Sequence, residues 1–335
     1  MLPEWIVLIV MIAALLFYAL LGGADFGGGM WDLLAMGPRA RRQRDAIAEA
    51  IGPVWEANHV WLILVIVLLF SAFPSAFGAI MTALHIPLTL VLVGIVMRGA
   101  AFVFRKYDAQ NDRVHRRWST LFGIASFLTP LMLGVTVGGL ATGAIVVKDG
   151  SLTSGFVAGW TTPFALACGL FTQGLFAFLA AVYLTLDTAD DPPLQNDFRL
   201  RALFSGITLA PAALLVFLLA RYEAPALHGA TSSWWAAPLF TLTSIAALTA
   251  LAALFRRRFA AARAAAIAQV ALVILGWTLA QYPDLIPGSL SFDAAAAPAN
   301  VLWILIVCLG IGAVLLIPSL YYLFKVFKAS RTQAE

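Results

Sequence analysis

Charged residues and cysteines are both scarce in this sequence. Only 11% of its residues are Asp, Glu, Lys or Arg, whereas 62% are hydrophobic, and the mean hydropathy is +0.92. So little charge excludes a soluble globular class for a chain of 335 residues. The formal net charge is only +4, and we expect no nucleic acid as a partner. The composition predicts an all-α polytopic membrane protein.

The two cysteines, Cys168 and Cys308, lie inside apolar segments and form no CxxC or CxxCH spacing. Neither a disulfide framework nor covalent haem attachment is therefore predicted. The first apolar segment has no basic residues before it and no small-residue cleavage pattern after it. We therefore expect no cleaved signal peptide.

Nine segments are long and apolar enough to cross about 30 Å of hydrocarbon. In chain order they cover residues 5–24, 53–73, 77–97, 118–146, 160–186, 200–220, 235–255, 264–282 and 301–324. We predict two four-helix bundles, in residues 1–147 and 148–283, and a peripheral ninth helix with a cytoplasmic tail in residues 284–335. The Asp-rich connector at residues 187–197 is predicted to be a solvated linker between the two halves.

The basic residues fall into alternate loops between these segments. Because cytoplasmic loops are enriched in Lys and Arg, this distribution predicts a periplasmic N-terminus and a cytoplasmic C-terminus. All of the 21 basic residues except Lys148 and Arg221 lie on the predicted cytoplasmic side: Arg39, Arg41, Arg42, Arg44, Arg98, Arg105, Lys106, Arg113, Arg116, Arg117, Arg199, Arg201, Arg256, Arg257, Arg258, Arg263, Lys325, Lys328 and Arg331.

Three ionisable residues lie where apolar segments reach this side. Asp25 ends the first segment, Glu56 begins the second and Arg98 ends the third. Charges in a membrane are costly unless they are paired or hydrated, and they commonly mark functional sites. We therefore predict that these residues form a polar cluster. Glu56 is our candidate for the proton-holding group, because a carboxylate that faces an arginine holds its proton less readily than one that is only desolvated.

His59 follows Glu56 by three positions, which places both on one helix face, with Trp55 beside them at the depth of the membrane interface. Glu-x-x-His is also half of a di-iron site, but a second copy is missing from the sequence. His85 is either an axial haem ligand or, as we favour, a core histidine beside a helix kink. We predict no metal site and no haem ligands in this chain.

Four features together resemble subunit II of the cytochrome bd-type quinol oxidases. They are GADFGGGM at residues 23–30, IGPVWEANHVWL at 51–62, FSAFP at 70–74, and Arg98 after a long apolar segment. The nine-span plan extends this resemblance over the whole chain. Many members of the family have Asp where Glu56 stands, so the acid is kept here with a longer reach. The short chain is also similar to the cyanide-insensitive branch.

The resemblance implies a complex in the bacterial cytoplasmic (inner) membrane that oxidises quinol and reduces dioxygen to water. Haem b558, haem b595 and haem d would be ligated by a homologous partner, subunit I. This chain would support that partner and help to line a proton route from the cytoplasm, with Asp25, Trp55, Glu56 and Arg98 near it. The identity of the quinone, a structural quinone or lipid in this chain, and a small single-helix subunit stay open.

Two other functions compete with this interpretation. A secondary transporter would couple transport to protons through the buried acids, but it would need inverted repeats and broken helices near the middle of the membrane. The acids here lie toward one face, and an odd ninth helix remains. A purely structural scaffold would share the oxidase partner and leave the acids dispensable.

Overall fold

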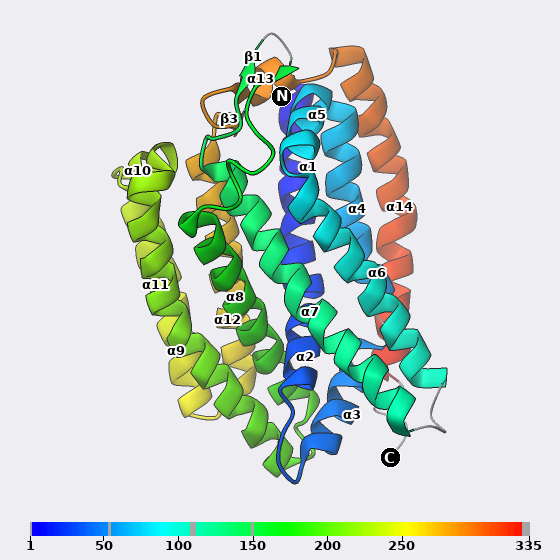
Figure 1. Ribbon diagram of the computed structural model, residues 1–335. Coiled ribbons are helices and arrows are strands. Elements are labelled where there is room, and N and C mark those ends of the chain that lie inside the picture. Colours follow the sequence, from blue (N-terminus) through cyan, green and yellow to red (C-terminus); the bar gives the residue numbers. More distant parts are fainter. Residues whose placement is uncertain (1, 53–54, 108–111, 149–150, 330–335) are drawn as a thin grey trace.

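The computed structural model describes residues 2–52, 55–107, 112–148 and 151–329. Over this part of the chain, nine helical segments are long and apolar enough to span a membrane, which confirms the predicted number. They run along one common direction, with the N-terminus at one end of the molecule and the C-terminus at the other (Figure 1). Pro53 and Val54, at the predicted start of the second span, and Arg331 in the tail lie outside the described residues.

The first half of the chain forms α1 (Pro3–Phe17), a π-helical turn η1 (Tyr18–Gly22), α2 (Gly23–Leu33), α3 (Ala40–Ile51), α4 (Trp55–Ala72), α5 (Pro74–Ala83), α6 (His85–Tyr107) and α7 (Asp112–Ala141). The second half forms α8 (Pro163–Asp187), α9 (Pro192–Glu223), α10 (Pro225–Thr231), α11 (Ala236–Phe255), α12 (Phe259–Gln281), α13 (Phe292–Ala295) and α14 (Ala299–Ala329). Strand β1 (Val147–Lys148) pairs antiparallel with β2 (Ser151–Leu152), and β3 (Asp284–Ile286) pairs with β4 (Leu290–Ser291). These hairpins lie at the two predicted domain boundaries, and the domains themselves stay a prediction.

The first span is longer than predicted, because the glycine-rich segment after residue 22 continues as α2 instead of ending the helix. The span therefore covers Pro3–Leu33 and places Asp25 inside it, not at its end. Glycine is tolerated here because α8 lies very close. A Cβ atom on Gly27 would lie only 2.0 Å from the backbone oxygen of Phe176. The small residues thus allow close helix packing, as expected for membrane helices.

The third span begins later than predicted. Phe73 leaves the helical conformation, Pro74 starts the short helix α5, and Leu84 interrupts the helix again before α6 begins at His85. Proline is favoured at the first position of a helix because its missing N–H group needs no partner there. Residues 77–83 therefore belong to a separate short helix, and the span covers His85–Arg105.

Helix α8 forms the centre of the molecule. It packs against α2 and α7 from the first half and against α9 and α12 from the second (Figure 1). One hydrophobic core therefore includes residues of both halves, among them Phe26 of α2 and Phe178 of α8. Helix α14 contrasts with α8, because only 6% of its most apolar membrane-spanning stretch is buried. The grouping into two bundles stays a prediction.

The Asp-rich connector is not the solvated linker that we predicted. Asp191 caps the N-terminus of α9 by accepting a hydrogen bond from the backbone N–H of Leu194, and it also pairs with Arg42. Arg39 donates two hydrogen bonds to Asp197, at 2.6 and 2.7 Å, and this carboxylate raises the pKa of Arg39 above its ordinary value. These pairs fasten α3 to α9 and so join the two halves.

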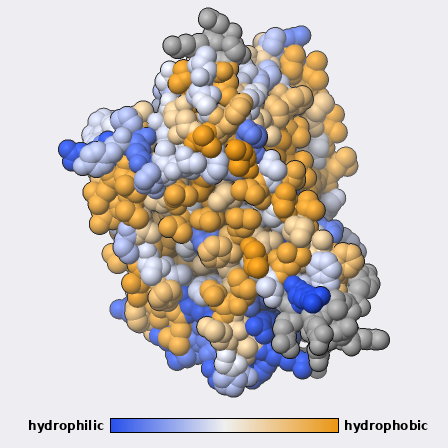
Figure 2. Space-filling view, in the orientation of Figure 1, coloured by the Kyte–Doolittle hydropathy of each residue, from blue (hydrophilic) through white to orange (hydrophobic). Residues whose placement is uncertain are grey.

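Hydrophobic and hydrophilic residues occupy different levels of the surface along the direction of the helices. Figure 2 shows hydrophobic residues over the middle of the visible face and hydrophilic residues gathered at the end where α3 lies. The arginines at this end include Arg39 beside Asp197 and the cluster Arg256, Arg257 and Arg258 between α11 and α12. An apolar belt between polar ends is what a membrane-spanning protein requires.

Replacing Gly27 with alanine is expected to lower the melting temperature of the purified protein. The added Cβ atom would meet the Phe176 backbone oxygen at 2.0 Å and the Cβ atom of Ala180 at 2.7 Å, so α2 and α8 would have to separate. Overpacking of this kind costs about 1–3 kcal/mol. Gly78→Ala is the matched control, because no atom lies within 4 Å of its added Cβ. Equal melting temperatures for the two variants would contradict the expected clash.

Candidate functional site

A buried hydrogen bond connects the first two spans. The side chain of Asn58 on α4 donates from Nδ2 to Oδ2 of Asp25 on α2, at 2.6 Å. Asp25 is 7% exposed and Asn58 is 2% exposed. A buried carboxylate needs such partners, because desolvation of an unpaired charge is costly. The bond therefore fixes the position of Asp25 between the helices.

The π-helical turn η1 places a phenol beside this pair. Its first residue, Tyr18, is 2% exposed, and its ring lies 6.0 Å from the ring of His59 and 6.5 Å from that of Phe26. A π-helical turn shifts the angular phase of a helix and is frequent at functional sites. The phenol oxygen is buried and has no hydrogen-bond partner in the described part of the chain.

Arg98 of α6 completes the cluster from a third span. It is 1% exposed, and its guanidinium carbon lies 4.9 Å from the centroid of the Phe26 ring and 5.2 Å from that of Phe122. Its charge interacts with that of Asp25, although the two side chains form no direct ion pair among the described residues. Buried polar groups usually have partners. The unpartnered Nε and Nη2 atoms of Arg98, together with the Tyr18 hydroxyl, are therefore positioned to bind water.

The structure brings Asp25 and Arg98 together as predicted, but Glu56 lies apart from them. Glu56 is on an exposed face of α4, whereas Asn58, two residues later, points inward to Asp25. Residues two apart on a helix lie about 200° apart around its axis, so the two side chains point to opposite sides. Glu56 is therefore no part of the buried cluster formed by this chain.

His59 and Trp55 border the buried cluster. The ring of His59 lies 5.9 Å from that of Phe26 and 6.3 Å from that of Trp55, and its Nδ1 atom is buried without a partner among the described residues. Trp55 also packs against Phe102 of α6, at 6.0 Å between ring centroids. Both residues were predicted to share the face of Glu56. Instead, His59 faces the cluster formed by Tyr18 and Asp25.

A buried ion pair lies nearer the α3 end of the first span. Arg105 of α6 donates to Asp32 of α2 at 3.0 Å, and the Asp32 side chain is 1% exposed. This residue pair, as well as Tyr18 and Asn58, is absent from our sequence prediction. Asn58 carries the clearest missed signal, because an amide inside an apolar segment must find a partner.

His85 lies at the surface of the described structure. His85 is exposed, and its Nδ1 atom lies 2.8 Å from the backbone oxygen of Thr82, so it is not the core histidine that we favoured. Across the described residues, no group of three or more His, Cys, Asp or Glu side chains could hold a metal ion.

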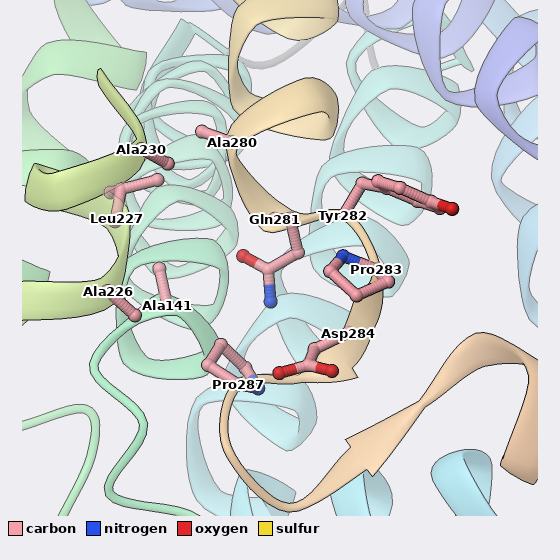
Figure 3. A pocket seen from close by; sticks show the side chains of 10 residues that line it. All are labelled: Ala141, Ala226, Leu227, Ala230, Ala280, Gln281, Tyr282, Pro283, Asp284 and Pro287. Atoms are coloured by element: carbon pink, nitrogen blue, oxygen red, sulfur yellow. The ribbon is translucent and has the colours of Figure 1, made fainter. Parts of the chain in front are cut away.

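Two cavities lie between helices of the described structure. The larger, about 190 Å³, lies between α10, the end of α12 and the β3 hairpin, and the side chains of Gln281 and Asp284 point into it (Figure 3). The smaller, about 60 Å³, lies between α2, α3 and α8 and is lined by Asp25. Both are smaller than the roughly 300 Å³ at which pockets for drug-sized ligands begin.

Comparison with known proteins identifies the family of this chain. The model of the family "Cytochrome bd terminal oxidase subunit II" matches residues 3–327. The chain belongs to this family. The buried Asp25 and Arg98 are thus part of an oxidase subunit, as the resemblance of the sequence motifs implied.

The sequence identity to individual proteins of the family is low. The chain is 29% identical over 185 residues to "Cytochrome bd-I ubiquinol oxidase subunit 2" of Escherichia coli (strain K12), covering 54% of this chain and 48% of that protein. It is 30% identical over 196 residues to "Cytochrome bd ubiquinol oxidase subunit 2" of Bacillus subtilis (strain 168), covering 58% and 55%. The chain spans about half the length of the curated relatives it matches.

The fold is shared over nearly the full length of a solved structure. "The structure of bd oxidase from Geobacillus thermodenitrificans" contains a chain that matches 97% of this one and is itself covered to 98%, with a TM-score of 0.76 and 23% sequence identity. This similarity shows the fold alone. The arrangement of helices described above is therefore that of a chain in a bd oxidase.

Proposed function

We propose that this chain is the second subunit of a quinol:dioxygen oxidoreductase, that it supports a haem-bearing subunit I, and that it lines part of a proton route. The observation that carries the proposal is the buried cluster of Asp25, Asn58 and Arg98 in a member of this family. Reduction of dioxygen to water consumes one proton for each electron. A buried carboxyl group can take up and release such protons, because desolvation disfavours its charged form while an amide donor and a nearby cation favour it.

The haems of the complex supply electron transfer and the chemistry of oxygen reduction. We infer that haem b558, haem b595 and haem d are all held by subunit I, as the resemblance of the sequence to this family implies. The role of this chain is then to hold and pass protons at the carboxyl oxygens of Asp25. A small single-helix subunit, a structural quinone or a lipid would be additions to this arrangement.

The surface for subunit I follows from the faces that this chain leaves unpacked. Helix α14 lies beside α4 (Figure 1), and both helices carry exposed large apolar side chains. On α4, Ile63, Val67 and Phe70 are 58%, 45% and 59% exposed, and Glu56 is exposed on the same helix face. A carboxylate at the end of an apolar stripe is better satisfied by a protein partner than by lipid tails. Glu56 would thus lie at the boundary between this chain and subunit I.

The orientation is part of the same proposal. The end that carries α3 and most of the described arginines would face the cytoplasm of a bacterial cell, and the N-terminus would face the periplasm. Asp25 lies about 12 Å from the end of its span at Leu33, at a rise of 1.5 Å per residue. Protons would therefore reach it from the cytoplasmic side over a short distance.

Purification of the tagged chain from its own membrane tests the proposed partnership. We expect a haem-containing protein to co-migrate with it, and the absorption of b- and d-type haems to be present in the complex and absent from the isolated chain. Binding of haem by the isolated chain would contradict the assignment of all haems to subunit I. Migration of the chain alone, in a membrane that contains both subunits, would contradict the complex.

Replacing Glu56 with glutamine in that complex tests the role of its surface position. We expect the complex to assemble and to consume oxygen several-fold more slowly, because the carboxylate at the subunit boundary can no longer carry a proton. The measurement is quinol-dependent oxygen consumption, normalised to haem content. Glu49→Gln, on the exposed side of α3, is the matched control. A wild-type rate for Glu56→Gln would remove Glu56 from the proton route.

A further inference from the structure

The smaller cavity adjoins Asp25 and has no lining residue from α4. Its volume is about 60 Å³, and its walls come from α2, α3 and α8. Asp25 lines its inner end, and Tyr183 and Asp187 of α8 line it nearer the α3 end of the molecule. Asp187 is exposed, whereas Asp25 is buried. The cavity therefore lies between a buried carboxylate and one at the surface.

The order of residues on α8 gives the cavity its direction. Ala180, Tyr183 and Asp187 recur at intervals of three and four, so they form one stripe along the helix. From Ala180 to Asp187 this stripe extends about 10 Å, at 1.5 Å per residue. On α2, Asp25 and Gly28 are three apart and face the same space. The two helices thus form facing walls of a short passage.

Burial within the cluster agrees with access from this side. Asp25 retains 7% of its surface, whereas Asn58 and Arg98 retain 2% and 1%. A water molecule needs roughly 10–15 Å³ of accessible space and two to four polar partners. A cavity of about 60 Å³ that is lined by Asp25, Tyr183 and Asp187 has room for a short chain of waters and offers it polar partners.

The position of Tyr183 is fixed from outside the passage. The guanidinium carbon of Arg263, on α12, lies 4.5 Å from the centroid of the Tyr183 ring. A cation over an aromatic face is attracted by the ring electrons, which holds the ring in place. The tyrosine therefore borders the passage as a fixed wall, and the aliphatic side chain of Ile51 on α3 lies opposite Gly28.

We propose that this cavity is a water-filled proton inlet within this chain, with Asp187 as the outer proton acceptor and Asp25 as the inner one. A proton from bulk water binds the Asp187 carboxylate, passes along the waters by exchange of O–H bonds, and binds a carboxyl oxygen of Asp25. Asp187 returns to its carboxylate form, and no oxidant or reductant takes part. The inference rests on the proposed function. It adds an entrance between α3 and α8, separate from the exposed face of Glu56.

Replacing Asp187 with asparagine tests the outer acceptor in the intact oxidase complex. We expect several-fold slower quinol-dependent oxygen consumption and a larger solvent isotope effect in D₂O, because proton entry becomes rate-limiting. Asp187→Glu restores the carboxylate and should restore both values. Asp190→Asn is the matched control, since Asp190 is exposed just beyond the end of α8 and does not line the cavity. A merely structural role of Asp187 would leave the isotope effect unchanged.

Replacing Gly28 with alanine tests the passage itself. The added Cβ atom would lie 2.9 Å from Cδ1 of Ile51, the flexible end of a side chain that can shift, so the methyl group would narrow the cavity without separating the helices. We expect slower oxygen consumption with an unchanged melting temperature of the complex. Gly78→Ala adds a methyl group in open space and should keep the wild-type rate.

The outcomes separate this inlet from the proposed function. If Asp25→Ala is slow while Asp187→Asn and Gly28→Ala both keep the wild-type rate and isotope effect, the inlet is overturned and Asp25 receives protons from elsewhere. If Asp25→Ala also keeps the wild-type rate, the proton role of the whole cluster fails. Asp187→Asn remains informative even if Gly28→Ala does not assemble, because Asp187 is at the surface.

Discussion

Replacement of Asp25 with alanine is expected to lower quinol-dependent oxygen consumption by about a hundredfold, the lower end of the effect of losing a proton-transfer group. Asp25 is the buried carboxylate of the cluster, Asn58 on α4 holds it by a hydrogen bond, and the charge of Arg98 on α6 acts on it. Without it, no other buried carboxylate described in this cluster can take over the proton. The rate should be measured on the purified complex and normalised to its haem content.

Two further variants separate proton transfer from packing. Asp25→Asn keeps the size of the side chain and an oxygen that accepts from Asn58, but it cannot hold the proton, so we expect it to be nearly as slow as Asp25→Ala. Asp45→Ala, on the exposed side of α3, should keep the wild-type rate. A near-normal rate for Asp25→Asn, with a slow Asp25→Ala, would assign Asp25 a structural role only.

Much of the fold could be predicted because the membrane constrains it strongly. An apolar segment in lipid must satisfy its own backbone hydrogen bonds. Length and hydropathy alone therefore give the number of membrane-spanning segments. The boundaries were less predictable where packing decides them. The residues from Gly23 to Leu33 look like a loop from their glycine content, yet they form α2 because α8 lies close enough to require small residues.

The candidate site was predicted in part, and the errors have a common cause. Asp25 and Arg98 were found because charges are conspicuous in apolar segments, and α2 and α6 bring them together. The side on which Glu56 projects depends on the rotation of α4, which packing against α1 and η1 determines and which spacing in the sequence cannot reveal. Tyr18 was missed for the same reason, since the π-helical turn shifts its direction.

Membership in the oxidase family favours one of the three functions that the sequence left open. A transporter with its acids in a central binding site would need broken helices near the middle of the membrane. Here the first and third spans, which carry Asp25 and Arg98, continue past the cluster, with a π-helical turn as the irregularity in the first. A scaffold with dispensable acids remains the direct competitor, and the Asp25 variants distinguish the two.

Replacement of Arg98 with leucine is expected to have the largest effect on assembly. Arg98 is among the largest fully buried side chains, and its charge interacts with that of Asp25. Removing one partner of a buried charged pair costs about 3–5 kcal/mol, because the other charge stays buried without compensation. Loss of the cation over the Phe26 ring adds to this cost. We expect little assembled complex in the membrane, measured from its haem absorption.

The double variant Arg98→Leu with Asp25→Asn shows whether the uncompensated charge is the cause. No buried carboxylate remains in it, so we expect the complex to assemble better than with Arg98→Leu alone, although it should still consume oxygen slowly. Arg41→Leu, at an exposed position of α3, controls for the loss of an arginine as such. If the two substitutions in the cluster destabilise additively, the residues are not coupled. Arg98 would then act through its aromatic contacts, and its charge would have no part in holding Asp25.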